Sequence, residues 1–145
     1  MKKLIIILLT ALILTGCRPS DSTGPYEQTD GDMLVIGDRF FITQIMDLFI
    51  NSDQHLGRTI QYEGAFTSIY SQESGNYYHF VFRYTLGCCG SEPIGLEVLL
   101  NGFEPLPDDT WVEVTGILVW HDGFLTLQAT SLIEMEERGL ERVSN

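Results

Sequence analysis

The sequence predicts a mainly β fold, a small closed barrel of five to six strands with one short N-terminal helix. Five stretches between residues 58 and 133 alternate apolar and polar side chains, as half-buried strands do. Gly64 and Gly116 interrupt two of these stretches, where they would let a strand bend. The 145 residues fit one domain, and an OB-like β-barrel is the natural candidate at this size, with an open sandwich as the alternative.

The domain is expected to begin with one strand and one helix. Residues 33–36 are all apolar and predict a short opening strand, which Gly37 and Asp38 end. Beyond them, apolar side chains recur at helical spacing, so we expect a short helix near 41–51. Turn-forming residues then separate this helix from the strands.

The expected barrel strands span 58–70, 76–86, 94–100, 110–120 and 124–133. The second has the clearest alternation and presents one wholly apolar face, which we expect to be buried; its members are Tyr78, Phe80, Phe82, Tyr84 and Leu86. The pair Asp122 and Gly123 between the last two strands predicts a tight hairpin turn, because both residues tolerate positive φ.

The charged C-terminal residues 134–145 are expected to be helical or frayed. Trp111 lies out of phase with Val112 and Val114, so its side chain should point to the other face of its strand. We expect the terminal helix to bury it there.

The N-terminus has the order of parts found in a bacterial lipoprotein signal. Lys2 and Lys3 precede an apolar run over 4–14, which is too short to span a bilayer. The run leads into Leu14-Thr15-Gly16-Cys17, which resembles a lipobox. The resemblance implies cleavage before Cys17, lipidation of its thiol and acylation of its amine, so that several chains anchor the protein stably.

These features divide the chain into a signal peptide (1–16), a lipid-anchored flexible tether (17–32), the β domain (33–137) and a C-terminal tail (138–145). We therefore expect the domain on the extracytoplasmic side of a cell membrane or outer membrane. Six arginines oppose 20 acidic residues once the two lysines of the signal are removed. Such an acidic surface repels phosphate backbones, which excludes nucleic acid as an expected partner.

Several motifs in the β domain resemble the C-terminal domain of the YcgQ-like family. They are Leu56-Gly57-Arg58-Thr59-Ile60, the Phe80-Val81-Phe82-Arg83-Tyr84 strand leading into Cys88-Cys89, Pro93-Ile94-Gly95-Leu96-Glu97-Val98 and Asp109-Thr110-Trp111-Val112. The resemblance covers about residues 35–133. It implies no defined reaction, but it does imply a partner, because such proteins are often encoded beside a putative membrane permease. Where family members carry an Ala-Asp-Ala-like segment, this chain has Gly90-Ser91-Glu92, and it has a lipid anchor in place of transmembrane helices.

If Cys17 is lipidated, Cys88 and Cys89 are the only remaining thiols. Adjacent side chains on a strand diverge, but Gly87 and Gly90 would permit a turn that brings the sulfurs together. Thiolates there suit a thiophilic metal such as zinc or copper, for which His79, Glu92 and His121 are the weak candidate co-ligands. A reducible vicinal disulfide and a merely structural turn remain open alternatives.

His55, His79 and His121 are otherwise expected at the surface. No nucleophile elbow, phosphate loop or HExxH motif is present, which disfavours an enzyme. The sequence therefore favours an anchored binding module for a small ligand, a metal, a permease or another envelope protein. The alternatives are a structural or interaction lipoprotein of the envelope and a thiol redox protein.

Overall fold

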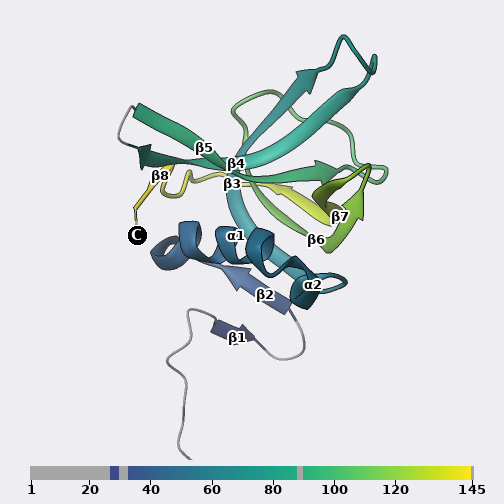
Figure 1. Ribbon diagram of the computed structural model, residues 1–145. Helices are drawn as coiled ribbons and strands as arrows, with labels where there is room; N and C mark the ends of the chain where they lie inside the picture. Colours follow the sequence, from purple (N-terminus) through teal and green to yellow (C-terminus); the bar gives the residue numbers. More distant parts are fainter. Residues whose placement is uncertain (1–26, 30–32, 88–89, 145) are drawn as a thin grey trace, which may run out of the picture.

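The computed structural model describes residues 27–29, 33–87 and 90–144 (Figure 1). The elements in chain order are β1 (Glu27–Thr29), β2 (Met33–Ile36), the 3-10 helix η1 (Asp38–Phe40), α1 (Phe41–Ile50), α2 (Ser52–His55), β3 (Thr59–Tyr70), β4 (Tyr77–Gly87), β5 (Gly90–Leu99), β6 (Trp111–His121), β7 (Phe124–Glu134) and β8 (Arg142–Val143). The expected opening strand and helix are confirmed. The part of the chain described here contains no helix long and apolar enough to cross a membrane.

Five strands close into a barrel. β3, β4 and β5 form an antiparallel meander, β5 then pairs in parallel with β7, β7 with β6, and β6 returns to β3. This closed circuit confirms the small OB-like barrel and excludes the open sandwich. Asp122 and Gly123 join β6 to β7 with positive φ values of 49° and 86°, as the hairpin prediction requires.

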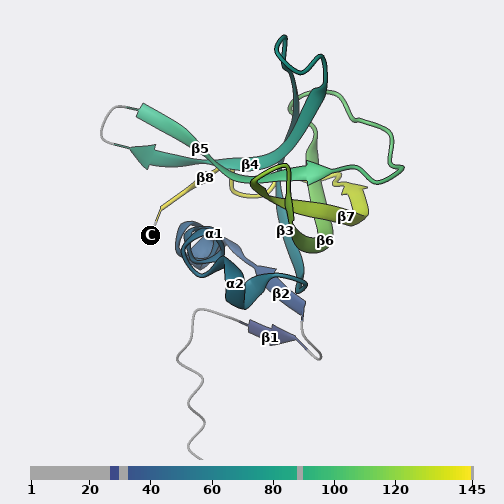
Figure 2. The same ribbon diagram turned by 45° about the vertical axis from the view of Figure 1, so that its right-hand side comes forward.

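The segment before the barrel is a β-α-β unit. β2 pairs in parallel with the start of β3, and α1 makes the connection between them. The helix lies beneath the barrel, between it and the β1–β2 pair (Figures 1 and 2). Its core-facing side chains Phe41, Ile45 and Leu48 are fully buried, so the helix closes the lower end of the barrel core.

Two glycines allow the strands to bend, as predicted. At Gly64, β3 is about to exchange its partner β6 for β4, and a Cβ atom there would lie 2.7 Å from the Phe82 carbonyl oxygen. At Gly116 the register of β6 and β7 shifts by one residue, and a Cβ atom would lie 2.5 Å from the Gln128 carbonyl oxygen. Both contacts are with backbone, which cannot move aside cheaply.

The orientation of β4 is the reverse of the expected one. Val81 and Arg83 point into the barrel and are 0% and 2% exposed, whereas the predicted inward residues Phe80 and Phe82 are partly exposed and Leu86 is 69% exposed. A five-stranded barrel has a narrow interior, which large side chains of β3 and α1 already occupy. The compact Val81 fits that space, and the aromatic side chains of β4 face outward.

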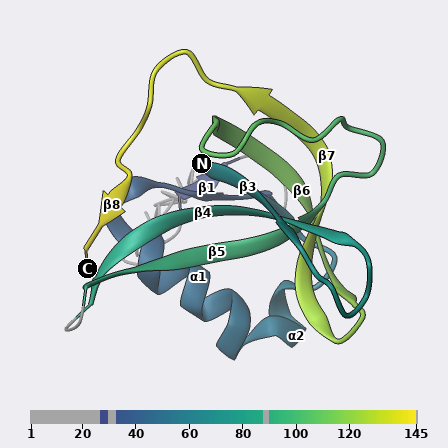
Figure 3. The ribbon, with the colours of Figure 1, turned by 90° about the horizontal axis from the view of Figure 1, so that it is seen from above.

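The C-terminal segment is not a helix. Residues 134–144 run in extended and bent conformation, and β8 pairs in parallel with β4 at Tyr84 and Thr85. Seen from above, this segment runs beside the barrel toward the projecting β4–β5 hairpin (Figure 3). Trp111 is buried as expected, but it lies beneath this irregular segment, with Gly139 against its ring.

Candidate functional site

The structure disperses the residues proposed around the paired thiols. Cys88 and Cys89 lie outside the described residues, as does Cys17. Gly87 and Gly90 face each other across the end of the β4–β5 hairpin. Only the two cysteines connect them in the sequence, so the predicted metal or thiol site stays a prediction.

Of the three weak co-ligand candidates, only Glu92 lies near that turn. It is exposed on β5, opposite Thr85. His79 precedes Gly87 by eight residues on β4, which corresponds to about 26 Å of strand. His121 lies in the β6–β7 hairpin, near Glu97, which follows Gly90 by seven residues on β5, or about 23 Å of strand. Within the described ranges, no three His, Cys, Asp or Glu residues are grouped so that they could hold a metal ion.

The histidines differ in their surroundings. His121 is exposed, as expected. His79 is partly buried, stacked on Phe66 at 5.7 Å and hydrogen-bonded to Ser68 at 2.8 Å. Burial lowers its pKa below the ordinary value.

The expectation that His55 lies at the surface is wrong, since its side chain is buried in α2. Its Nε2 atom lies 2.8 Å from Asp47 Oδ2, and its Nδ1 atom lies 3.1 Å from an Arg58 nitrogen. Arginine only donates, so Nδ1 accepts from Arg58 and Nε2–H donates to Asp47. The nitrogen that would activate a nucleophile is therefore occupied, and this network ties α1 to α2 and to the start of β3.

Arg83 is the buried cation of the barrel. It lies just past the point where β3 and β4 stop pairing, and its Nε donates to the Glu63 carbonyl oxygen at 2.6 Å. Another guanidinium nitrogen donates to Asp38 Oδ1 at 2.5 Å. The guanidinium lies 4.6 Å from the ring centre of Phe41 and 5.4 Å from that of Trp111. These contacts satisfy the charge, so Arg83 closes the opening between the strands and offers no free donor surface.

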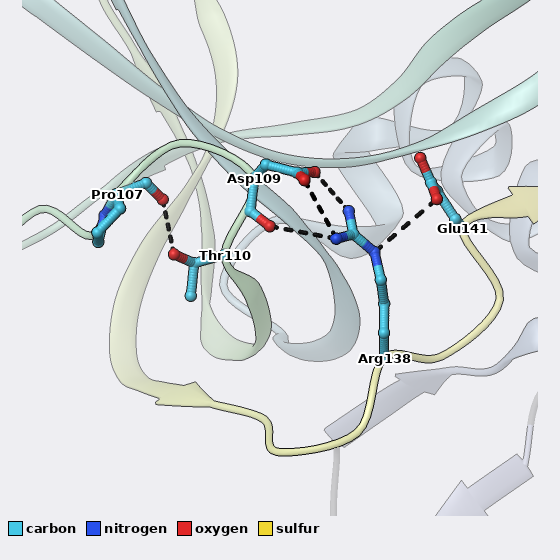
Figure 4. Close-up of polar contacts among 5 residues, drawn as sticks. All are labelled: Pro107, Asp109, Thr110, Arg138 and Glu141. Carbon is cyan, nitrogen blue, oxygen red and sulfur yellow. Dashed lines mark hydrogen bonds and ion pairs between the residues drawn. The ribbon is translucent and has the colours of Figure 1, made fainter.

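The C-terminal segment is held over Trp111 by a second arginine. Arg138 pairs with both carboxylate oxygens of Asp109 and lies 3.9 Å from Glu141 (Figure 4). Its guanidinium stacks 5.3 Å from the Trp111 ring centre. On the other side, the Trp111 indole N–H donates to Glu63 Oε2 at 3.2 Å. The hydrogen bond between Arg138 and Asp109 lowers the pKa of the Asp109 carboxyl and raises the pKa of the Arg138 guanidinium.

The strongest candidate for an interaction site is the outer surface of β4, β5 and β7. Strand register places residues directly across from one another on one face of a sheet. One such row crosses four strands, from Phe80 through Glu97 and Thr126 to Val119. Beside this row, Phe82 lies opposite Gly95, and at the β6–β7 hairpin His121 lies opposite Phe124. We call this surface the aromatic face, defined by Tyr78, Phe80, Phe82, Tyr84, Glu97, Leu99, Phe124 and Thr126.

The side chains of the aromatic face pack against one another. Thr126 points outward yet is 0% exposed, so its outer neighbours cover it, and its hydroxyl donates to the Phe124 carbonyl oxygen at 3.2 Å. The Phe82 and Tyr84 rings meet edge to face at 5.2 Å. Phe124 at the margin is 63% exposed. The domain therefore displays an ordered apolar surface, and sequence reasoning had assigned the β4 side chains of this surface to the core.

Glu97 is the one acidic member of the aromatic face. It is partly buried, with Phe80 directly across on β4 and Thr126 directly across on β7. Burial raises the pKa of Glu97, while the charge of nearby His121 lowers it and that of Asp122 raises it. Sequence reasoning did not single out Glu97. The alternation of apolar side chains on its strand was the available signal, because it places Glu97 on the outer face.

The comparison with protein families agrees with the motifs. A family model described as the DUF1980 C-terminal domain matches residues 21–138. No curated protein matches the chain. This domain is the YcgQ-like one that the sequence motifs resemble. The chain therefore belongs to the DUF1980 C-terminal domain family.

Proposed function

We propose that this chain is a non-enzymatic binding module that holds a partner on its aromatic face. The observation that carries the proposal is the inverted β4 strand, whose aromatic side chains face outward although an apolar core was available. An ordered, outward apolar surface on a small domain marks an interaction site more often than a structural one. The outer surface of the second and third barrel strands is also where OB-folds bind ligands, which supports the proposal by analogy of fold.

The N-terminal signal supports a proposed site of action at the membrane. The lipobox ending in Cys17 supports a lipid anchor on the extracytoplasmic side, and the short tether keeps the domain close to the membrane. The permease association of the resembling family makes a membrane transport protein the partner that we propose. The strongly acidic composition suits a basic protein surface and disfavours nucleic acid.

The test is site-specific photocrosslinking in intact cells that express the full chain. A photoreactive residue in place of Phe80 should give a defined membrane-protein adduct. The same residue in place of Gln72, in the exposed β3–β4 turn, is the matched control and should give none. Equal adducts from both positions, or none from Phe80, would contradict binding through the aromatic face. Loss of membrane fractionation in Cys17→Ser tests the anchor separately.

A further inference from the structure

The position of Glu97 indicates what kind of partner the aromatic face accepts. A carboxylate that leaves water loses hydration free energy, which a folded protein normally regains with a cation or with hydrogen-bond donors. The described residues give Glu97 no ion pair and no hydrogen bond, and its nearest titratable neighbours are His121 and Asp122. The charge of His121 lowers the pKa of Glu97 and offsets only part of the effect of burial, because this histidine is 46% exposed and also lies 3.8 Å from Asp122.

The surroundings of this carboxylate suit an organic cation. Phe80 lies directly across from Glu97 on β4. Thr126 lies across from Glu97 on β7, and Phe124 precedes Thr126 by two residues on the same face of that strand. Aromatic faces attract ammonium and guanidinium groups, and the attraction grows where water is excluded. The apolar stem of a lysine or arginine can lie along the same aromatic surface while its charged end reaches the carboxylate.

We propose that Glu97 binds a lysine or arginine side chain of a basic, apolar segment of the partner protein, laid across Phe80 and Phe124. This inference rests on the proposed function and specifies its partner chemistry. Charge complementarity supports a basic partner, because 20 acidic residues face only 8 basic ones in the whole chain. The width of the surface, three strands across, supports an extended segment over a small free amine.

The test uses two peptides that differ only in charge. Both are short, blocked peptides of alternating leucine and threonine; one has a central arginine and the other has citrulline, its neutral isostere. Each is titrated into purified full chain and followed by amide chemical shifts. We expect the arginine peptide to perturb the amides of β4, β5 and β7 and to bind at least tenfold more tightly than the citrulline peptide.

Two conservative variants test whether Glu97 causes the difference in affinity between the two peptides. Glu97→Gln keeps the shape of the side chain and should reduce binding of the arginine peptide to that of the citrulline peptide. Glu137→Gln replaces an exposed glutamate of the C-terminal segment, outside the aromatic face, and should leave binding unchanged. Because Glu97 makes no hydrogen bond or ion pair with the residues that the structure describes, its replacement should not impair folding, which a thermal melt of each variant checks.

Each other outcome overturns the inference in a distinguishable way. Equal binding of both peptides at the aromatic face would remove the role of Glu97 and leave the proposed function intact. Shifts elsewhere, or none, would contradict both. Equal binding of N-acetylarginine amide would indicate a small-cation site without a partner segment. Concentration-dependent shifts without peptide would indicate that a second copy of the chain occupies the face.

Discussion

Removing the hydroxyl of Tyr62 should weaken the attachment of the β4–β5 hairpin, which carries much of the aromatic face, to the barrel core. Tyr62 lies on β3 and is 1% exposed. Its hydroxyl donates to the Val81 carbonyl oxygen at 2.8 Å and accepts from the Leu96 amide at 3.2 Å. Val81 and Leu96 face each other in the β4–β5 pair, so one hydroxyl bridges both strands.

The magnitude follows from these two hydrogen bonds. Each contributes about 1 kcal/mol net, and a buried group left without a partner costs about 1–3 kcal/mol. Tyr62→Phe keeps the ring and its edge-to-face contact with Phe41, so the only volume lost is that of the hydroxyl and the hydrogen bonds dominate the change. We therefore expect the free energy of unfolding to fall by about 2–5 kcal/mol, which is a large fraction of the stability of a domain of this size.

Urea unfolding followed by circular dichroism measures this change, with Tyr78→Phe as the matched control. The Tyr78 hydroxyl makes one exposed hydrogen bond, to Ser74 at 3.1 Å, and its loss should change stability by about 0.5 kcal/mol or less. Equal midpoints for the two variants would refute the bridging role of Tyr62.

The same residue gives a pH signature with a defined sign. Burial raises the pKa of Tyr62 far above its ordinary value of about 10. The unfolded chain therefore releases this proton at lower pH than the folded chain does. Stability is complete below about pH 10 and falls above it, by about 1.4 kcal/mol per pH unit for this group. The wild type should lose stability between pH 10 and 11 more steeply than Tyr62→Phe, and parallel curves would contradict the burial of this hydroxyl.

Three further predictions address the barrel, the buried cation and Glu97. Gly95→Ala would place a Cβ atom 2.1 Å from the Val81 carbonyl oxygen and should cost about 1–3 kcal/mol or more in urea unfolding, whereas Gly37→Ala, with nothing within 4 Å, should cost far less. Arg83→Lys removes the planar donor pair that is stacked between two rings and should lower the free energy of unfolding by about 1–3 kcal/mol; an unchanged midpoint would mean that an ammonium serves equally well. For Glu97, whose pKa burial raises, the folded state binds its proton more tightly than the unfolded state, so wild-type stability should gain more than that of Glu97→Gln as pH falls from 7 through the carboxyl range.

The barrel was predictable because its determinants are local. Alternation located the strands, Gly64 and Gly116 marked the bends, and Asp122-Gly123 fixed a hairpin by its tolerance of positive φ. These signals depend on a few neighbouring residues. They identify a barrel strand, but not which of its two faces the interior can accommodate.

The reversal of β4 shows where local reasoning stops. Alternation favoured burial of the aromatic face, but the interior accepts Val81 and a fully paired Arg83. Arg83 is tolerated there only because partners from distant elements converge on it, the carboxylate of Asp38 and the rings of Phe41 and Trp111. No pattern within the strand encodes that convergence. His55 was misplaced for the same reason, since its burial depends on partners from α1 and from the start of β3.

The reversal also ties stability to function. A barrel that buries an arginine must supply its partners, and replacing such a group with an apolar one is often neutral or stabilising. The inverted strand leaves its large apolar side chains on the outside, where they add little to folding. Arg83 on one side of β4 and the aromatic side chains on the other are alternate residues of the same strand, so the cation that fixes its orientation also determines which face a partner meets. If the aromatic face is the binding surface, Arg83→Lys should weaken binding of the arginine peptide in proportion to how far it loosens β4, although Arg83 is buried beneath that face and cannot touch the peptide.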